Sequence, residues 1–116
     1  MKFEVRTTPR FEKAVKALAK KYRSFKSDLS NLIDSLEENG LQGTEISPGI
    51  RKLRLAIISK KKGKSGGARV ITYSIVLSEE EGRVYLIDVY DKSDFSSVDV
   101  NIIKKIIEDL SLGDFG

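Results

Sequence analysis

The chain has 116 residues, of which 40% are hydrophobic and 33% are charged, so it is long enough for one domain with its own core. It contains no cysteine and no histidine, which excludes disulfides, thiolate chemistry, and catalysis or metal binding by imidazole. No apolar run approaches the roughly 18 residues of a membrane span, and the alternating N-terminus is unlike a signal peptide. We therefore expect a cytoplasmic protein that makes no membrane contact.

The formal charge of +4 is distributed unevenly along the chain. The segment Arg51–Arg69 contains eight of the 21 basic residues and no acidic one, so the rest of the chain is net negative. A local excess of positive charge on a mildly acidic protein is typical of polyanion binding, most often to nucleic acid. Lysines at a hairpin tip can also serve only solubility and edge protection, which is the alternative.

The N-terminal residues predict a strand followed by a helix. Residues 2–7 alternate in polarity, as a half-buried strand does. Thr8 is a favourable N-cap and Pro9 suits the first helical position, so a helix is expected from there to about Tyr22. The lysines outside its apolar stripe either contact nucleic acid or face solvent.

A second helix is predicted over residues 25–38, ending at Asn39-Gly40. Because few residues separate the two helices, they are expected to form an antiparallel hairpin. Residues 41–49 contain two glycines and a proline and are interpreted as a loop that leads to the sheet.

The second half of the chain predicts three strands and a helix. Alternating apolar residues indicate strands around Leu53–Ile57 and Ile71–Leu77, joined by a tip rich in lysine and glycine. A third strand is expected over Arg83–Asp91, and a last helix over residues 99–110. That helix carries enough apolar surface either to pack on the sheet or to cover a partner site.

The predicted order is therefore β-α-α-β-β-β-α in a single α+β domain over residues 1–110, with a tail at 111–116. We expect an antiparallel-dominated sheet with the helical hairpin packed on one face. The first strand is expected to join the sheet beside a later strand, giving one layer of helices on one layer of sheet.

If the polyanion is RNA, its cleavage without a metal needs a proton acceptor, a proton donor and cations around the phosphate. Without histidine, proton transfer falls to Lys, Tyr, Asp or Glu. Arg69 is the strongest candidate phosphate ligand, because its guanidinium presents a rigid fork from the start of a strand. The alternative for Arg69 is an ion pair with Asp88 or Asp91. Gly66 and Gly67, just before it, permit close backbone approach.

The end of the third predicted strand forms a second candidate group, Tyr90-Asp91-Lys92. Adjacent strand residues point to opposite faces, so all three can share one cleft only if the strand bends. No phosphate-binding loop, dinucleotide-binding glycine motif, serine hydrolase motif or zinc protease motif is present.

Three stretches together resemble the RelE/ParE superfamily of bacterial toxins, most closely the HigB-type, RelE-like toxins. They are GIRKLR at 49–54, GKSGGARVI at 63–71 and VYLIDVYDKS at 84–93. The resemblance extends over about residues 2–110 and implies a RelE-like, microbial RNase-like fold. The chain departs from the family pattern in having no histidine at the last strand end and no tyrosine in the final helical region.

The resemblance also implies an activity and partners. It implies the toxin of a toxin–antitoxin system, a ribosome-dependent endoribonuclease (an mRNA interferase) that cleaves mRNA in the A site. Cleavage would proceed by attack of the 2′-OH, with no metal and no cofactor. The partners would be mRNA, the rRNA of the A site, and an antitoxin encoded alongside, often a helix-turn-helix protein.

Carried over to this sequence, the resemblance supports one set of site residues and the basic hairpin supports another. The expected catalytic residues, which lie where relatives place theirs, are Arg69, Lys64, Lys62, Tyr90, Asp91 and Lys92. The expected RNA-binding residues, from the basic segment and the strand that follows it, are Arg51, Lys52, Arg54, Lys60, Lys61 and Tyr73.

Two alternatives remain open. Relatives of the ParE branch inhibit DNA gyrase by binding it, without nuclease activity. A family member that has lost catalysis would bind only RNA or an antitoxin.

Overall fold

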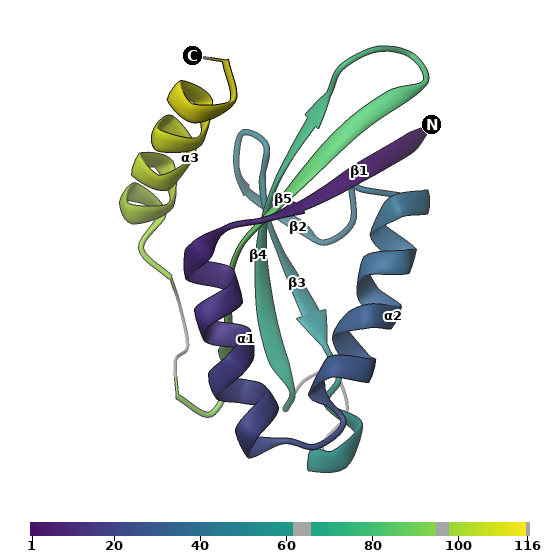
Figure 1. The fold of residues 1–116 in the computed structure, drawn as a ribbon, viewed down its shortest axis with the longest axis vertical. Helices are drawn as coiled ribbons and strands as arrows, with labels where there is room; N and C mark the ends of the chain where they lie inside the picture. The colour runs from purple at the N-terminus through teal and green to yellow at the C-terminus, as the bar shows by residue number, and fades with distance from the viewer. Residues whose placement is uncertain (62–65, 95–97, 116) are drawn as a thin grey trace.

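The computed structural model describes residues 1–61, 66–94 and 98–115, with side chains up to Leu110 (Figure 1). Its elements, in chain order, are β1 Lys2–Thr7, α1 Pro9–Lys21, α2 Phe25–Glu38, β2 Thr44–Ser47, β3 Ile50–Leu55, the short 3-10 helix η1 Ile58–Lys60, β4 Ala68–Val76, β5 Glu81–Asp91 and α3 Val100–Phe115. The strands form one mixed sheet in the order β1-β5-β4-β3-β2. β1 runs parallel to β5, and the other neighbours are antiparallel. The α+β class and the placement of β1 beside a later strand are confirmed.

Local signals fix the first helix as the sequence predicts. The hydroxyl of Thr8 accepts a hydrogen bond from the Phe11 N–H at 3.1 Å, and Pro9 occupies the first turn. The same hydroxyl lies 3.1 Å from the Leu86 carbonyl oxygen, to which it donates. Thr8 therefore both starts α1 and ties that start to β5.

The sheet separates two apolar cores, because alternate residues of its central strands point to opposite faces. Val70 and Leu86 pack with the apolar sides of α1 and α2. Their neighbours Ile71 and Ile87 pack instead in a second core around Ile103 of α3. In Figure 1, α3 accordingly stands apart from the α1–α2 pair.

The structure corrects the predicted architecture in three respects. Residues 44–47 form β2 instead of a loop, pairing with the start of β3 across an irregularity between Glu45 and Ser47. The strand is only four residues long and follows Gly43, so its periodic signal is weak. The last helix continues beyond Leu110 to Phe115. Helices cover both faces of the sheet, so the expected single helical layer is wrong, although the packing of α3 on the sheet is confirmed. Within the described part of the chain, no helix is both long and apolar enough to cross a membrane.

The contact between β1 and β5 depends on a glycine. Phe3 is paired with Gly82 across the parallel ladder, and the buried Phe3 ring lies over that glycine. A Cβ on Gly82 would lie 2.3 Å from the nearest ring carbon of Phe3. Any larger residue must displace the ring from the core.

We predict that Gly82→Ala lowers the free energy of unfolding by about 2 kcal/mol, because overpacking displaces a buried ring. Urea denaturation followed by circular dichroism measures the change. Glu80→Ala, at an exposed position in the adjacent turn, should unfold as the wild type does. Equal stability of Gly82→Ala and the wild type would contradict the tight packing of Phe3.

Candidate functional site

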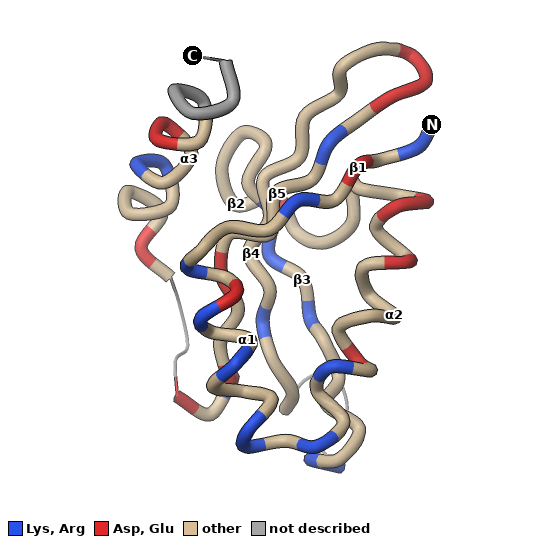
Figure 2. The backbone as a smooth tube through the Cα atoms, in the orientation of Figure 1, with Lys and Arg blue, Asp and Glu red and all other residues tan. Residues whose placement is uncertain are grey.

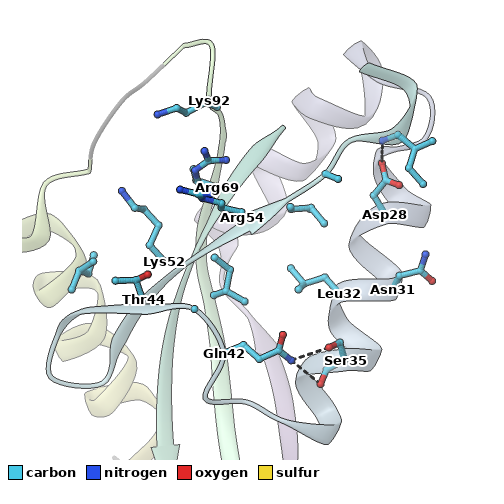
Figure 3. A pocket seen from close by; sticks show the side chains of 16 residues that line it. Asp28, Asn31, Leu32, Ser35, Gln42, Thr44, Lys52, Arg54, Arg69 and Lys92 are labelled. Atoms are coloured by element: carbon cyan, nitrogen blue, oxygen red, sulfur yellow. Dashed lines mark hydrogen bonds between the residues drawn. The ribbon is translucent and has the colours of Figure 1, made fainter. Parts of the chain in front are cut away.

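A groove of about 840 Å³ lies along the outer edge of β3, between α2 and the segment that contains β2 (Figure 3). β2 pairs with β3 only at residues 50–52, so the second half of β3 contributes to the groove wall. The groove is therefore a direct consequence of the shortness of β2.

Four cationic side chains line one side of this groove: Lys52, Arg54, Arg69 and Lys92. The sheet register explains their grouping. Arg54 of β3 is opposite Arg69 of β4, and Lys52 shares a face with Arg54 because it is two residues away. Lys92 follows the last residue of β5, whose Tyr90 is opposite Arg69. We call these four residues the cation cluster.

The members of the cation cluster differ in exposure. Arg54 and Lys92 are exposed, Lys52 is half-buried, and Arg69 is only 6% exposed. The Arg69 guanidinium donates to its neighbour's carbonyl oxygen, Ala68 O, at 3.1 Å. The two carboxylates considered as partners of Arg69 each form another ion pair: Asp88 with Arg10 at 3.2 Å and Asp91 with Lys60 at 2.6 Å.

Among the described residues that line the groove, Asp28 supplies the one carboxylate. It is buried, and its Oδ2 accepts from the Ser24 hydroxyl at 2.7 Å and from the Ile58 N–H at 3.0 Å. Ser24 in turn accepts from the Ser59 N–H at 2.8 Å. Asp28 thus holds η1 against α2 and does not pair with the cation cluster.

Asp91 faces away from the cation cluster, toward α1. Its side chain is fully buried, and Oδ2 accepts from the Tyr22 hydroxyl at 2.5 Å. Oδ1 accepts from Lys60 Nζ at 2.6 Å and from the Ser93 N–H at 2.9 Å. Asp91 therefore points to the opposite face of the sheet from Tyr90, as strand alternation predicts.

These contacts also determine the charge state of Asp91. Burial alone would raise the pKa of the carboxyl, but the hydrogen bonds from Lys60, Tyr22 and Ser93 outweigh burial and lower its pKa below the usual range. Asp91 is therefore ionised near neutral pH. Its oxygens are occupied by structural donors, which leaves it poorly placed to accept a proton from a substrate.

Tyr22 is a residue of this network that the sequence did not reveal. The sequence indicates Tyr22 only as the end of the first helix, and its ring packs against the core there. Its hydroxyl, however, meets a carboxylate 69 positions later in the chain. The Lys60 ammonium lies 5.6 Å from the centre of the same ring, so the Tyr22 ring and the Asp91 carboxylate both bind Lys60.

Tyr90 lies on the same face of the sheet as the cation cluster, opposite Arg69, but it is buried. Its hydroxyl is buried, and burial raises the pKa of the phenol, with a further increase from Asp88 and an opposing effect of Arg69. The phenol is therefore protonated near neutral pH. Tyr90 does not line the groove and is the cross-strand neighbour of Arg69.

The remaining predicted residues lie in different places. Arg51 points to the opposite face from Lys52 and donates to the Gly43 carbonyl at 3.4 Å. Tyr73 shares the face of Arg69 but stacks on Tyr85, with ring centres 6.4 Å apart. Lys61 is exposed after η1. Lys62 and Lys64 lie outside the described residues.

Gly67 makes a close backbone contact, and its partner is the backbone of β3 in the same chain. A Cβ there would lie 2.1 Å from the Leu55 carbonyl oxygen. The Gly67 carbonyl accepts from the Lys92 N–H at 3.0 Å. The glycine thus lets the start of β4 pass between the ends of β3 and β5, which brings Arg69 and Lys92 to one site.

No group of three or more potential metal ligands occurs in the ranges that the structure describes. A scan against models of protein families finds none that matches this chain. The resemblance to the RelE/ParE superfamily therefore rests on the three stretches quoted above.

We predict that Asp91→Asn lowers the free energy of unfolding by about 3 kcal/mol near neutral pH, because a buried ion pair loses its anion. A carboxyl with a lowered pKa stabilises the fold above its unfolded pKa of about 3.9 and loses that contribution as pH falls below it. The difference between wild type and variant should thus be constant from about pH 5 to 8 and shrink below about pH 4. Urea titrations across this range measure it.

Asp94→Asn is the matched control, because Asp94 is exposed in the same loop. It should leave stability unchanged at every pH. A difference between wild type and Asp91→Asn that persists undiminished at pH 3 would contradict the ionic role of Asp91.

Proposed function

We propose that the protein is a metal-independent endoribonuclease that cleaves mRNA in the ribosomal A site, as the toxin of a toxin–antitoxin system. The observation that supports this most directly is the cation cluster, in which three cations from β3 and β4 and one from just after β5 line one groove. Such a cluster suits the phosphodiester of an RNA strand. The RelE/ParE resemblance supplies the reaction and the ribosomal setting.

Within this proposal, the guanidinium groups of Arg54 and Arg69 bind the non-bridging oxygens of the scissile phosphate. The ribose 2′-oxygen attacks the adjacent phosphorus and loses its proton, while the bond from phosphorus to the 5′-oxygen breaks. The products are a 2′,3′-cyclic phosphate and a 5′-hydroxyl that has gained a proton. Fixed cations stabilise the negative charge that develops on the phosphate oxygens.

The proton transfers are assigned by position. The Lys92 ammonium is exposed at the edge of the cluster and is proposed to protonate the leaving 5′-oxygen. Tyr90, protonated and buried behind Arg69, is a positioning residue. Asp91 and Lys60 hold the scaffold. The base is proposed to be a lysine of the segment that contains Lys62 and Lys64.

The second candidate is a protein that binds RNA without cleaving it. The orientation of Asp91 favours this candidate, since the carboxylate nearest in sequence to the cluster is occupied on the other face. Charge also favours RNA over gyrase as the target, because a protein target needs less phosphate-type charge. Figure 2 shows Lys and Arg on α1, β3 and β4, and Asp and Glu along α2. Lys52 and Arg54 of β3 and Arg69 of β4 line the groove.

We predict that Arg54→Ala and Lys92→Ala each abolish most mRNA cleavage in a translating-ribosome assay, with ends mapped at the A-site codon. Both side chains are exposed, so the variants should fold normally. Binding to a short RNA should also lose about one unit of its salt slope in each variant, since each loses one phosphate contact.

Lys105→Ala, at an exposed position on α3, is the control and should cleave at the wild-type rate. Full cleavage by Arg54→Ala would overturn the assigned role of the cluster. Salt-dependent RNA binding with no cleavage by the wild type would establish the second candidate. Inhibition of gyrase supercoiling, with no RNA binding, would overturn both in favour of a ParE-like inhibitor.

A further inference from the structure

The groove continues beyond the cation cluster to a part with a different chemistry. There it is bounded by α2 and by the segment before β2, with Leu32, Ser35 and Gln42 in its wall (Figure 3). Among the described residues, the cations of the groove come from β3, β4 and the residue after β5, and none comes from α2 or from the segment before β2. A second phosphate would find no cation on these two walls, whereas an uncharged planar group needs none.

The side chain of Gln42 is held in one orientation. Its Nε2 lies 3.1 Å from the Ser35 carbonyl oxygen, 2.8 Å from the Asn39 carbonyl oxygen and 2.8 Å from the Ser35 hydroxyl, and its two hydrogens are shared among these three acceptors. Because backbone carbonyls only accept hydrogen bonds, the nitrogen must face them. The amide oxygen is thereby turned away from the C-terminal end of α2, and in Figure 3 it points along the groove toward Leu32.

This end of the groove thus combines an apolar surface with one fixed hydrogen-bond acceptor. Leu32 projects from α2 toward the groove, and Leu53 lines the β3 side. A nucleobase with an exocyclic amino group fits this chemistry, since its ring contacts apolar side chains and its amino group donates to a carbonyl oxygen.

We infer that the groove beside the cation cluster is a base-binding subsite for an unpaired RNA nucleotide, in which the oxygen of Gln42 accepts from an exocyclic amino group. The inference rests on the proposed function, because the neighbouring phosphate of that nucleotide is held by the cation cluster. It adds a preference among bases that phosphate contacts alone do not provide.

The experiment measures binding of 5′-fluorescein-labelled, 2′-O-methyl pentanucleotides by fluorescence anisotropy, so that cleavage does not interfere. Adenine is compared with unsubstituted purine, which lacks the amino group, at each position in turn. In the wild type, removal of the amino group at one position should weaken binding roughly tenfold, the cost of a lost hydrogen bond in a built site.

Gln42→Met should bind the two RNAs equally, since it keeps the size of the side chain and removes the acceptor. The measured quantity is a ratio, so a general loss of stability cancels. Asn101→Met, an exposed amide on α3, is the control and should discriminate as the wild type does.

Equal binding of the adenine and purine RNAs by the wild type at every position would overturn the subsite. The subsite would also be overturned if Gln42→Met still discriminates between the adenine and purine RNAs. If binding in either case still depends on Arg54 and Lys92, the proposed RNA-binding function stands without the subsite. Absence of any RNA binding by the wild type would overturn the proposed function and the subsite together.

Discussion

The carboxylate of Asp91 joins three segments that are far apart in the chain. It receives hydrogen bonds from Tyr22 at the end of α1, from Lys60 in η1, and from the backbone of Ser93 just after β5. The contact fixes the end of β5, and with it the backbone from which Lys92 projects. Because Lys60 is 9% exposed and Asp91 is fully buried, the pair is shielded from water and salt. Contacts on one face of the sheet therefore fix the backbone that carries Lys92 of the cation cluster on the other face.

Strand alternation turns this scaffold into a site. Tyr90 and Asp91 are adjacent, yet one supports the cluster and the other anchors the helices. In the same way, Arg51 binds the segment before β2, whereas Lys52 and Arg54 reach the groove. Alternate residues of β3 point to opposite faces of the sheet, so some basic side chains make structural contacts and others reach the groove. Among the cations of the basic segment that the structure describes, Lys52, Arg54 and Arg69 line the groove.

The groove depends on a strand that ends early. β2 covers only the first half of β3, and the uncovered half borders α2 with a cationic and a neutral end. The cationic end suits a phosphate and the neutral end suits a base, so one groove provides for both parts of a nucleotide. Gln42 shapes the neutral end through bonds that also hold the end of α2, whereas Asp28, near the start of α2, holds η1.

The sequence by itself determined the elements with strong local signals. Thr8-Pro9 and Asn39 mark helix boundaries, and alternating apolar residues mark β3, β4 and β5, because capping and periodicity are properties of neighbouring residues. It also determined that cations concentrate near Arg69. Only the tertiary structure decided which of them meet, since the pairing of Arg54 with Arg69 depends on strand register. The structure likewise decided that Tyr22 and Lys60 belong to Asp91, and that residues 44–47 form a strand. Those contacts join residues that are far apart in the chain. A local sequence pattern cannot indicate them, because the partners become neighbours only in the folded protein.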